Sequence, residues 1–213
     1  MSQKRVICFD VDETVTPGAS WETLSKSMGV DLDFHRKLYM DSESGILSIE
    51  EAENNLLKEY LQTGKATKQF IGEVLDSIDP FPEAHDLMSF FSKRDFRVYL
   101  VSGSVNIFIQ MISRKLNTWG WFANSHFEFD EVGILSKIGM VHGQGKEKVR
   151  QLYEISKIEN VDIREIFFVG DGTNDIPAFI ETGNGISVNS KNKELNKVAW
   201  HVVNNLESIK EFF

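Results

Sequence analysis

Short apolar runs alternate with longer helical patterns along most of the chain. The runs are VICF (residues 6–9), VYLV (98–101), IFFV (166–169) and the weaker GISV (185–188). They are rich in Val, Ile and Phe and show no clean alternation of apolar and polar side chains. This pattern is typical of strands that are covered on both faces.

Helical periodicity fills the segments between these runs. It predicts helices over residues 83–94, 104–116 and 145–157, and a further one from Asn174 that ends at a Gly cap, Gly183. Strands that alternate with helices predict an α/β fold, a Rossmann-like doubly wound parallel sheet. Ligands of such sheets bind at the carboxyl ends of the strands.

Residues 17–79 do not follow this alternation, because their pattern is helical throughout. Expected helices cover 32–40, 48–62 and 67–78, and Ser48 with Glu51 predicts a capping box at the second of these. We interpret the segment as a small helical cap domain, inserted after the first strand and placed to cover the site.

The remaining residues, 1–16 and 80–213, are then the core domain. Within the core, residues 126–141 predict a β-hairpin that turns near Asp130 to Gly133.

Composition narrows the choice of partners. The chain has 213 residues and a formal net charge of −9, which argues against nucleic acid and anionic membranes but leaves room for a small anionic substrate. Cys8 is the only cysteine, so no disulfide can form within the chain, which suits a reducing cytosol. The N-terminal apolar run is too short for a signal peptide, and no segment approaches membrane-spanning length. We therefore expect a cytoplasmic location.

Two aspartates directly after the first apolar run raise the question of chemistry. Asp10 and Asp12, with Thr14, form the pattern DVDET. Two carboxylates this close resist ionising together unless a cation lies between them. Such a pair could supply a nucleophile that attacks phosphorus and a neighbouring acid that serves the leaving group and the water. The alternative is an Asx turn or a helix N-cap.

The run IFFV leads into a second polar cluster, GDGTND. Its turn places Asp171 at the sheet edge, and Asn174 and Asp175 then open a helix. Carboxylate and amide oxygens of this kind suit Mg²⁺. A divalent cation held by Asp10 and Asp171 would remove the repulsion between Asp10 and Asp12, so the cluster predicts a magnesium site.

Two further positions suit an anion. Ser102 and Gly103 follow the run VYLV and precede a helix, where a hydroxyl and backbone N–H groups can hold phosphate oxygens; the alternative is a plain N-cap serine. Lys146 lies at a helix start, where a cation is unfavourable to the helix dipole unless it reaches an anion. We interpret Lys148 as a solvated surface lysine.

The ordered set DVDET, VSGS, GK and GDGTND resembles the four motifs of the haloacid dehalogenase superfamily. It is most similar to the phosphoserine phosphatase-like branch, which carries a helical cap after the first motif; residues 122–124 (FAN) and the following hairpin add to the resemblance. The resemblance implies a Mg²⁺-dependent phosphatase of a small phosphomonoester that works through a phospho-aspartyl intermediate.

Site roles follow from this resemblance position by position. Asp10 matches the nucleophile, and Asp12 matches the general acid and base. The resemblance implies a metal held by Asp10, Asp171 and the main-chain carbonyl of Asp12, with Asp175 in support. The expected phosphate-binding residues are Ser102, Gly103, Lys146 and Asn174, and Thr14 is expected to orient the first loop.

Two departures from the phosphoserine phosphatase pattern bear on the substrate. The glutamate that holds the substrate's amine is replaced, by counting, with Ala19, and the stretch GILSIEEAENNLLKEY holds no arginine for its carboxylate. We therefore expect a substrate other than phosphoserine, a cationic or neutral phosphomonoester. The expected specificity residues are Gly18, Ala19, Ser20 and Trp21, with a core role for Trp21 as the alternative.

Other functions stay open on the sequence alone. One is a phosphotransferase that passes the phosphoryl group to an acceptor other than water, and another is phosphoserine phosphatase proper. A receiver-like signalling domain is opposed by Asp12, because a residue that activates water shortens the life of the phosphoryl group. A silent binding protein is opposed by the complete motif set.

Overall fold

The computed structural model describes residues 5–213, so residues 1–4 of the expected core domain lie outside it. Within the described chain, strands join into one sheet of order β4-β3-β2-β1-β5-β6-β7. The strands are β1 (Arg5–Phe9), β2 (Phe96–Val105), β3 (Gly120–Phe129), β4 (Leu135–Gly139), β5 (Ile166–Gly170), β6 (Gly185–Val188) and β7 (His201–Val203). Neighbouring strands are parallel except for β3 and β4, which are antiparallel.

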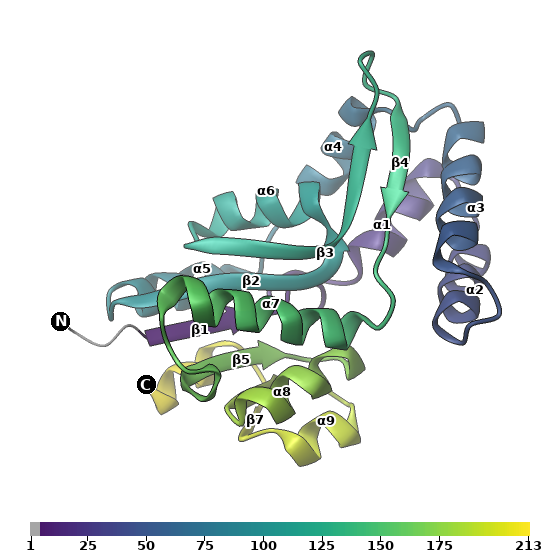
Figure 1. Ribbon diagram of the computed structural model, residues 1–213. Helices are drawn as coiled ribbons and strands as arrows, with labels where there is room; N and C mark the ends of the chain where they lie inside the picture. Colours follow the sequence, from purple (N-terminus) through teal and green to yellow (C-terminus); the bar gives the residue numbers. More distant parts are fainter. Residues whose placement is uncertain (1–4) are drawn as a thin grey trace.

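Helices cover both faces of the sheet (Figure 1). One face packs against α5 (Pro82–Ser92), α6 (Asn106–Leu116) and the C-terminal 3₁₀ helix η3 (Glu207–Phe212); the other packs against α7 (Gln144–Glu159), α8 (Ile176–Thr182) and α9 (Lys193–Val198). The predicted doubly wound α/β sheet is confirmed. None of the described helices is long and apolar enough to cross a membrane.

Strand β1 lies at the centre of the sheet and is buried on both faces. Ile7 and Phe9 belong to the core on the α5 and α6 side, whereas Val6 and Cys8 belong to the core on the α7 and α8 side. The period of two residues sends successive side chains to opposite faces. An apolar run without alternation is therefore the correct signature of this strand.

Two parts of the sheet were not predicted. The first half of β3 pairs in parallel with β2, and the short β7 pairs with β6 at the sheet edge. Neither carries a continuous apolar run, because β3 is only partly covered there and β7 has three residues. The predicted hairpin is confirmed: Asp130 accepts bonds from the N–H groups of Val132 and Ile134 in its turn.

The segment between β1 and α5 is helical, as expected. It contains α1 (Ser20–Met28), α2 (Leu32–Glu43), α3 (Ile49–Gln62) and α4 (Lys68–Asp76). The predicted capping box of Ser48 and Glu51 is present at α3, whereas α1 was missed as a separate element. The division into a core and a cap of residues 17–79 stays a prediction.

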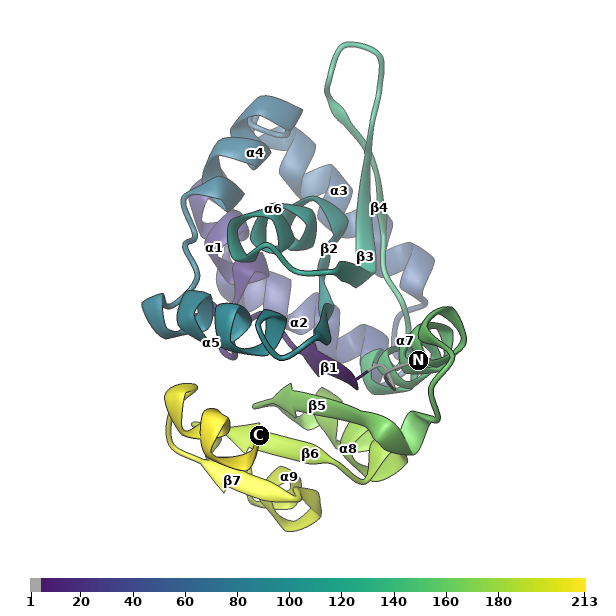
Figure 2. The same ribbon diagram turned by 90° about the vertical axis from the view of Figure 1, so that its left-hand side faces the viewer.

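The β3–β4 hairpin stands beside these helices (Figure 2). The N–H of Lys68 donates to the carbonyl of Gly133, and the N–H of Leu135 donates to the carbonyl of Ala66. The hairpin therefore joins the sheet to the start of α4.

Candidate active site

The polar ends of β1, β2 and β5 meet at one edge of the sheet. Asp10 follows β1, Ser102 lies in the last part of β2, and Asp171 follows β5. The three strands are adjacent and parallel, so their carboxyl ends share one edge. The parallel topology thus brings together residues that lie far apart in the chain.

Asp10 is buried at the centre of this edge, with 5% of its surface exposed. Its Oδ2 lies 2.9 Å from the Nζ of Lys148, and its backbone N–H donates to the carbonyl of Val169. The backbone bond fixes the position of the residue, and the ammonium group compensates the buried carboxylate.

Lys148 is fully buried and also contacts Asp175, whose Oδ1 lies 2.6 Å from the Nζ. The two carboxylates raise the pKa of Lys148 above its usual value although burial opposes this, so the side chain is a cation. The interpretation of Lys148 as a surface lysine is therefore wrong. The lysine that pairs with Asp10 is Lys148, and Lys146, two residues earlier on α7, is exposed.

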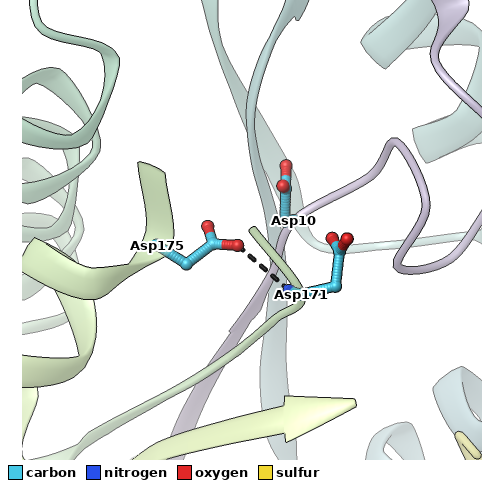
Figure 3. Close-up of side chains that lie close together, drawn as sticks. All are labelled: Asp10, Asp171 and Asp175. Atoms are coloured by element: carbon cyan, nitrogen blue, oxygen red, sulfur yellow. Dashed lines mark hydrogen bonds between the residues drawn. The ribbon is translucent and has the colours of Figure 1, made fainter. Parts of the chain in front are cut away.

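Asp171 and Asp175 lie on the loop after β5 (Figure 3). Oδ2 of Asp175 accepts the N–H groups of Asp171 and Gly172, at 3.1 and 3.0 Å. A Cβ on Gly170 would lie 2.3 Å from that oxygen, so only glycine leaves room for the carboxylate. Asp175 thus holds both the loop and Lys148.

The carboxyl of Asp171 lies beside that of Asp10 (Figure 3), and its Oδ1 accepts a bond of 2.7 Å from the hydroxyl of Thr14. Thr14 therefore links the loop after β1 to the loop after β5. Burial first and the charge of Asp10 second raise the pKa of Asp171 to about 7.

Asp12 lies between Asp10 and the helical segment. The hydroxyl of Ser20 donates to its Oδ2 at 2.7 Å and also contacts the hydroxyl of Ser104. Among residues 5–213, the buried Oδ1 of Asp12 has no hydrogen-bond partner. Burial raises the pKa of Asp12 to about 7, with a smaller contribution from Asp10 that Ser20 opposes. Such a carboxyl can both give and take a proton near neutral pH.

The β2 end of the site differs from expectation in its backbone. Strand β2 continues to Val105 with a register shift after Ser102, so Ser102 precedes the first residue of α6, Asn106, by four positions. A helix N-terminus therefore does not explain an anion site at Ser102. A Cβ on Gly103 would lie 2.8 Å from the side-chain oxygen of Gln144, which explains the glycine.

Gln144 was not singled out in the sequence. It is the first residue of α7, and the side-chain amide of Asn124 donates to its backbone carbonyl at 3.1 Å. The side chain of Asn124 also accepts from Gln151, so buried amides connect β3 to α7 behind the site.

A cavity of about 450 Å³ opens from this edge toward the helices of residues 20–62. Asp10, Asp12, Ser102, Gly103 and Asn174 line its floor.

The four expected specificity residues have different positions. Ala19 and Trp21 line the cavity, and Ser20 lies beneath it against Asp12. Gly18 does not line the cavity; its φ of +67° places it in a turn that favours glycine.

Two charged residues on the cavity wall were missed. Glu22 of α1 and Arg36 of α2 form a bidentate pair, with N–O distances of 2.7 and 2.8 Å. Glu22 lies three residues after Ala19, and Arg36 lies on α2, outside the stretch of residues 45–60. The absence of an arginine from residues 45–60 therefore does not leave the cavity wall without one.

The acidic edge suits a divalent cation. Asp10, Asp171 and Asp175 each offer one oxygen, and these oxygens lie within 4.8 Å of one another. Burial first, and the charge of Asp10 second, raise the pKa of Asp171, and a bound cation would favour its ionised form. Asp175 is fully buried and its two oxygens accept three bonds, from Lys148, Asp171 and Gly172, so it is the least available of the three as a ligand.

Comparisons with known proteins agree with this geometry. The model of the haloacid dehalogenase-like hydrolases matches residues 4–183. Among curated proteins, the phosphoserine phosphatase of Methanocaldococcus jannaschii is 29% identical over 184 residues, 85% of this chain and 83% of that protein. The phosphoserine phosphatase of Lactococcus lactis is 27% identical and covers 100% of this chain and 96% of its own length.

Solved structures give the same fold. A phospho-aspartyl intermediate analogue of phosphoserine phosphatase superposes with a TM-score of 0.78 at 23% identity, and 100% of each chain is covered. A substrate-bound phosphoserine phosphatase also superposes with a TM-score of 0.78, at 22% identity. The chain therefore belongs to the haloacid dehalogenase-like hydrolases, in the phosphoserine phosphatase-like branch, and is a phosphoric monoester hydrolase.

Proposed function

We propose that the protein is a Mg²⁺-dependent phosphatase that hydrolyses a small phosphomonoester through a phospho-aspartyl intermediate on Asp10. The observation that carries this proposal is the position of Asp10. Its carboxylate lies on the floor of the cavity and is paired with Lys148. Asp12, two residues further along the chain, supplies a carboxyl whose pKa is raised. A nucleophile, a neutralising cation and an acid thus meet at one point.

In the first step, a carboxylate oxygen of Asp10 attacks phosphorus as the ester P–O bond breaks. The leaving alkoxide takes a proton from Asp12, whose Oδ1 is free to reach it and whose pKa of about 7 leaves much of it protonated at neutral pH. Ser20 holds the other oxygen of Asp12 and so orients the acid.

In the second step, ionised Asp12 accepts a proton from water. The resulting hydroxide attacks phosphorus, the bond to the Asp10 oxygen breaks, and phosphate leaves. Ser102, Gly103 and Asn174 line the cavity, and in this proposal they hold the phosphoryl oxygens. Lys148, in place of Lys146, neutralises charge on Asp10 and the phosphate.

Asp10, Asp171 and the main-chain carbonyl of Asp12 would hold the Mg²⁺. When bound, the ion supplies positive charge against the phosphoryl oxygens. Asp175 supports this site by fixing the backbone of Asp171 and the ammonium of Lys148. Residues 17–79 act as the cap that forms the far wall of the cavity.

The preferred substrate in this proposal is a phosphomonoester other than phosphoserine. Glu22 and Arg36 compensate each other on the wall, which leaves neither charge available without breaking a bidentate pair. A second candidate is phosphoserine itself, since the same two side chains could separate to hold an ammonium and a carboxylate. This second candidate is kept because the curated relatives named above are phosphoserine phosphatases.

The test is release of phosphate from a panel of phosphomonoesters, with and without Mg²⁺, by the wild type and Asp10→Asn. Asp86→Asn, at an exposed aspartate on α5 that does not line the cavity, is the matched control. We expect metal-dependent turnover that Asp10→Asn abolishes and Asp86→Asn retains. Labelled substrate quenched in acid should leave a hydroxylamine-sensitive label on the wild type. Turnover that persists in Asp10→Asn would refute the proposal.

A further inference from the structure

The cavity joins two surfaces of different character. Its floor is polar and belongs to the strand ends around Asp10. Its far wall is built mainly from apolar side chains: Trp21, Leu38, Met40, Leu56 and Met140. The phosphoryl group belongs on the floor, so the alcohol part of the ester faces this wall.

The apolar wall is held firmly by the helices around it. Leu38 and Leu56 are buried, at 8% and 3% exposure, in the main hydrophobic core. Trp21 packs edge-on against Phe127 at 5.4 Å between ring centroids. These contacts fix the wall before any ligand arrives, and preorganised apolar walls favour apolar ligands.

Apart from the hydroxyl of Tyr39, the polar groups of the helices on this wall are engaged with protein partners. Glu22 and Arg36 form their bidentate pair, and both are partly exposed toward solvent. The Nδ1 of His35 lies 2.7 Å from the hydroxyl of Ser25. A ligand hydroxyl, amine or carboxylate near this wall would have to break these bonds or lose its water without a new partner.

We propose that the substrate is the phosphate monoester of an apolar alcohol, with an aromatic or alicyclic group that packs on Trp21, Leu38 and Leu56. This inference rests on the proposed phosphatase activity and narrows its substrate class. A volume of about 450 Å³ holds a phosphate together with one ring. An apolar ring gains from burial against the wall, and a polyhydroxylated ring of the same size does not.

The test compares two primary alkyl phosphates built on six-membered rings, cyclohexylmethyl phosphate and glucose 6-phosphate, with phosphoserine as a third substrate. Each is assayed for kcat/KM with Mg²⁺. We expect cyclohexylmethyl phosphate to exceed both others by about thirtyfold or more, since unpartnered polar groups cost on the order of ten- to a hundredfold in recognition.

Two wall variants locate the preference. Met40→Gln replaces an exposed wall residue with a polar one of similar shape, so folding should be retained. We expect it to raise the KM for cyclohexylmethyl phosphate severalfold with kcat unchanged, because the contact is equal in ground and transition states. Leu56→Asn should raise the KM further. Leu61 is an exposed leucine on the same helix and does not line the cavity, so Leu61→Asn should leave kcat and KM unchanged.

The outcomes separate the two proposals. Asp10-dependent turnover that is equal for the two rings, or highest for glucose 6-phosphate or phosphoserine, overturns the apolar substrate and retains the phosphatase. The same holds if Met40→Gln and Leu56→Asn leave every KM unchanged. No Mg²⁺-dependent hydrolysis of any ester overturns both.

Discussion

Lys148 shows how a single residue was misjudged from local context. The helix dipole indicated Lys146, which lies in the first turn of α7, as the lysine that reaches an anion. Helix periodicity gives a better signal, because Lys148, Leu152 and Ile155 recur at intervals of four and three residues and are buried on one face. A lysine on the apolar face of a helix needs a buried anion, and Asp10 and Asp175 supply two.

Substitution of Lys148 tests whether this buried cation is needed for activity and stability. Lys148→Met leaves two carboxylates close together without their cation, so we expect phosphatase activity to fall about a hundred- to a thousandfold. Breaking a buried pair also costs roughly 3–5 kcal/mol of stability, which thermal unfolding followed by circular dichroism will measure. Lys146→Met should alter activity less than twofold. A larger loss in Lys146→Met than in Lys148→Met would restore the original assignment.

His35 gives a prediction about pH. Burial is the main cause that lowers its pKa, with Arg36 acting in the same direction and Glu22 against it. Above the unfolded pKa of about 6.5 both states are neutral. As pH falls below that value the unfolded state takes up the proton first, so stability is lost on acidification.

His35→Gln should therefore flatten the fall in stability between pH 6.5 and 5, measured by urea unfolding at a series of pH values. At pH 7.5 the free energy of unfolding of the same variant should fall by only about 1 kcal/mol, the net contribution of the hydrogen bond to Ser25. A slope identical to that of the wild type would show that His35 titrates normally.

At the scale of elements, the β3–β4 hairpin connects the sheet to the helices of residues 20–76. Its tip is bonded to the start of α4 through Lys68 and Gly133, and β4 packs beside α3. Beyond β4, the N–H of Met140 donates to Glu53 of α3 at 2.6 Å, shortly before α7 begins. The position of the helices is thereby tied to the helix that carries Lys148.

Lys68→Pro isolates one of these connections. Lys68 is the first residue of α4, where proline is favoured, and Thr67 already has the extended backbone that precedes proline. The substitution removes the hydrogen bond to Gly133, which contributes about 1 kcal/mol to stability. Proline also reduces the conformational entropy of the unfolded chain, which stabilises the fold by about 0.4–1 kcal/mol.

We therefore expect little change in Tm but roughly tenfold faster hydrogen exchange of the Leu135 amide. The N–H of Leu135 donates to the carbonyl of Ala66, next to the bond that the substitution removes. Lys68→Ala keeps the N–H and should exchange as the wild type does. Unchanged exchange in the proline variant would mean that the sheet alone holds the hairpin.

At the scale of the whole molecule, the site is a place where the fold concentrates negative charge. Asp10, Asp12, Asp171 and Asp175 meet at one sheet edge, with Lys148 as the buried cation among them. Burial and mutual repulsion raise the pKa values of Asp12 and Asp171 to about 7. The folded protein therefore gains stability from any further cation bound at this edge.

Metal addition tests this expectation without an assay of activity. Saturating Mg²⁺ at about 100 times its Kd should stabilise the fold by about 2.7 kcal/mol, or roughly 5–11 °C in Tm. A chelator should reverse the shift, and Asp171→Asn should abolish it. Asp86→Asn should keep the full shift. An equal shift in Asp171→Asn would place the metal elsewhere.

Several features followed from the sequence because their physical causes are local. A buried strand needs a run of apolar side chains, and a helix needs apolar positions at intervals of three and four; these patterns gave β1, the first half of β2, β5 and most helices. The aspartates at the strand ends and Gly170, which packs against Asp175, could also be predicted, because each of these positions requires one residue type.

Tertiary structure decided everything that depends on contacts between distant segments. The register of β3, the choice of Lys148 over Lys146 and the pairing of Glu22 with Arg36 follow from which helix face packs against which neighbour. The cavity wall likewise joins residues from α1, α2 and α3 with Met140. Sequence determined the acidic and small polar residues that follow the strands, because each motif lies directly after a strand, whereas packing of the helices determined the cavity wall that faces them.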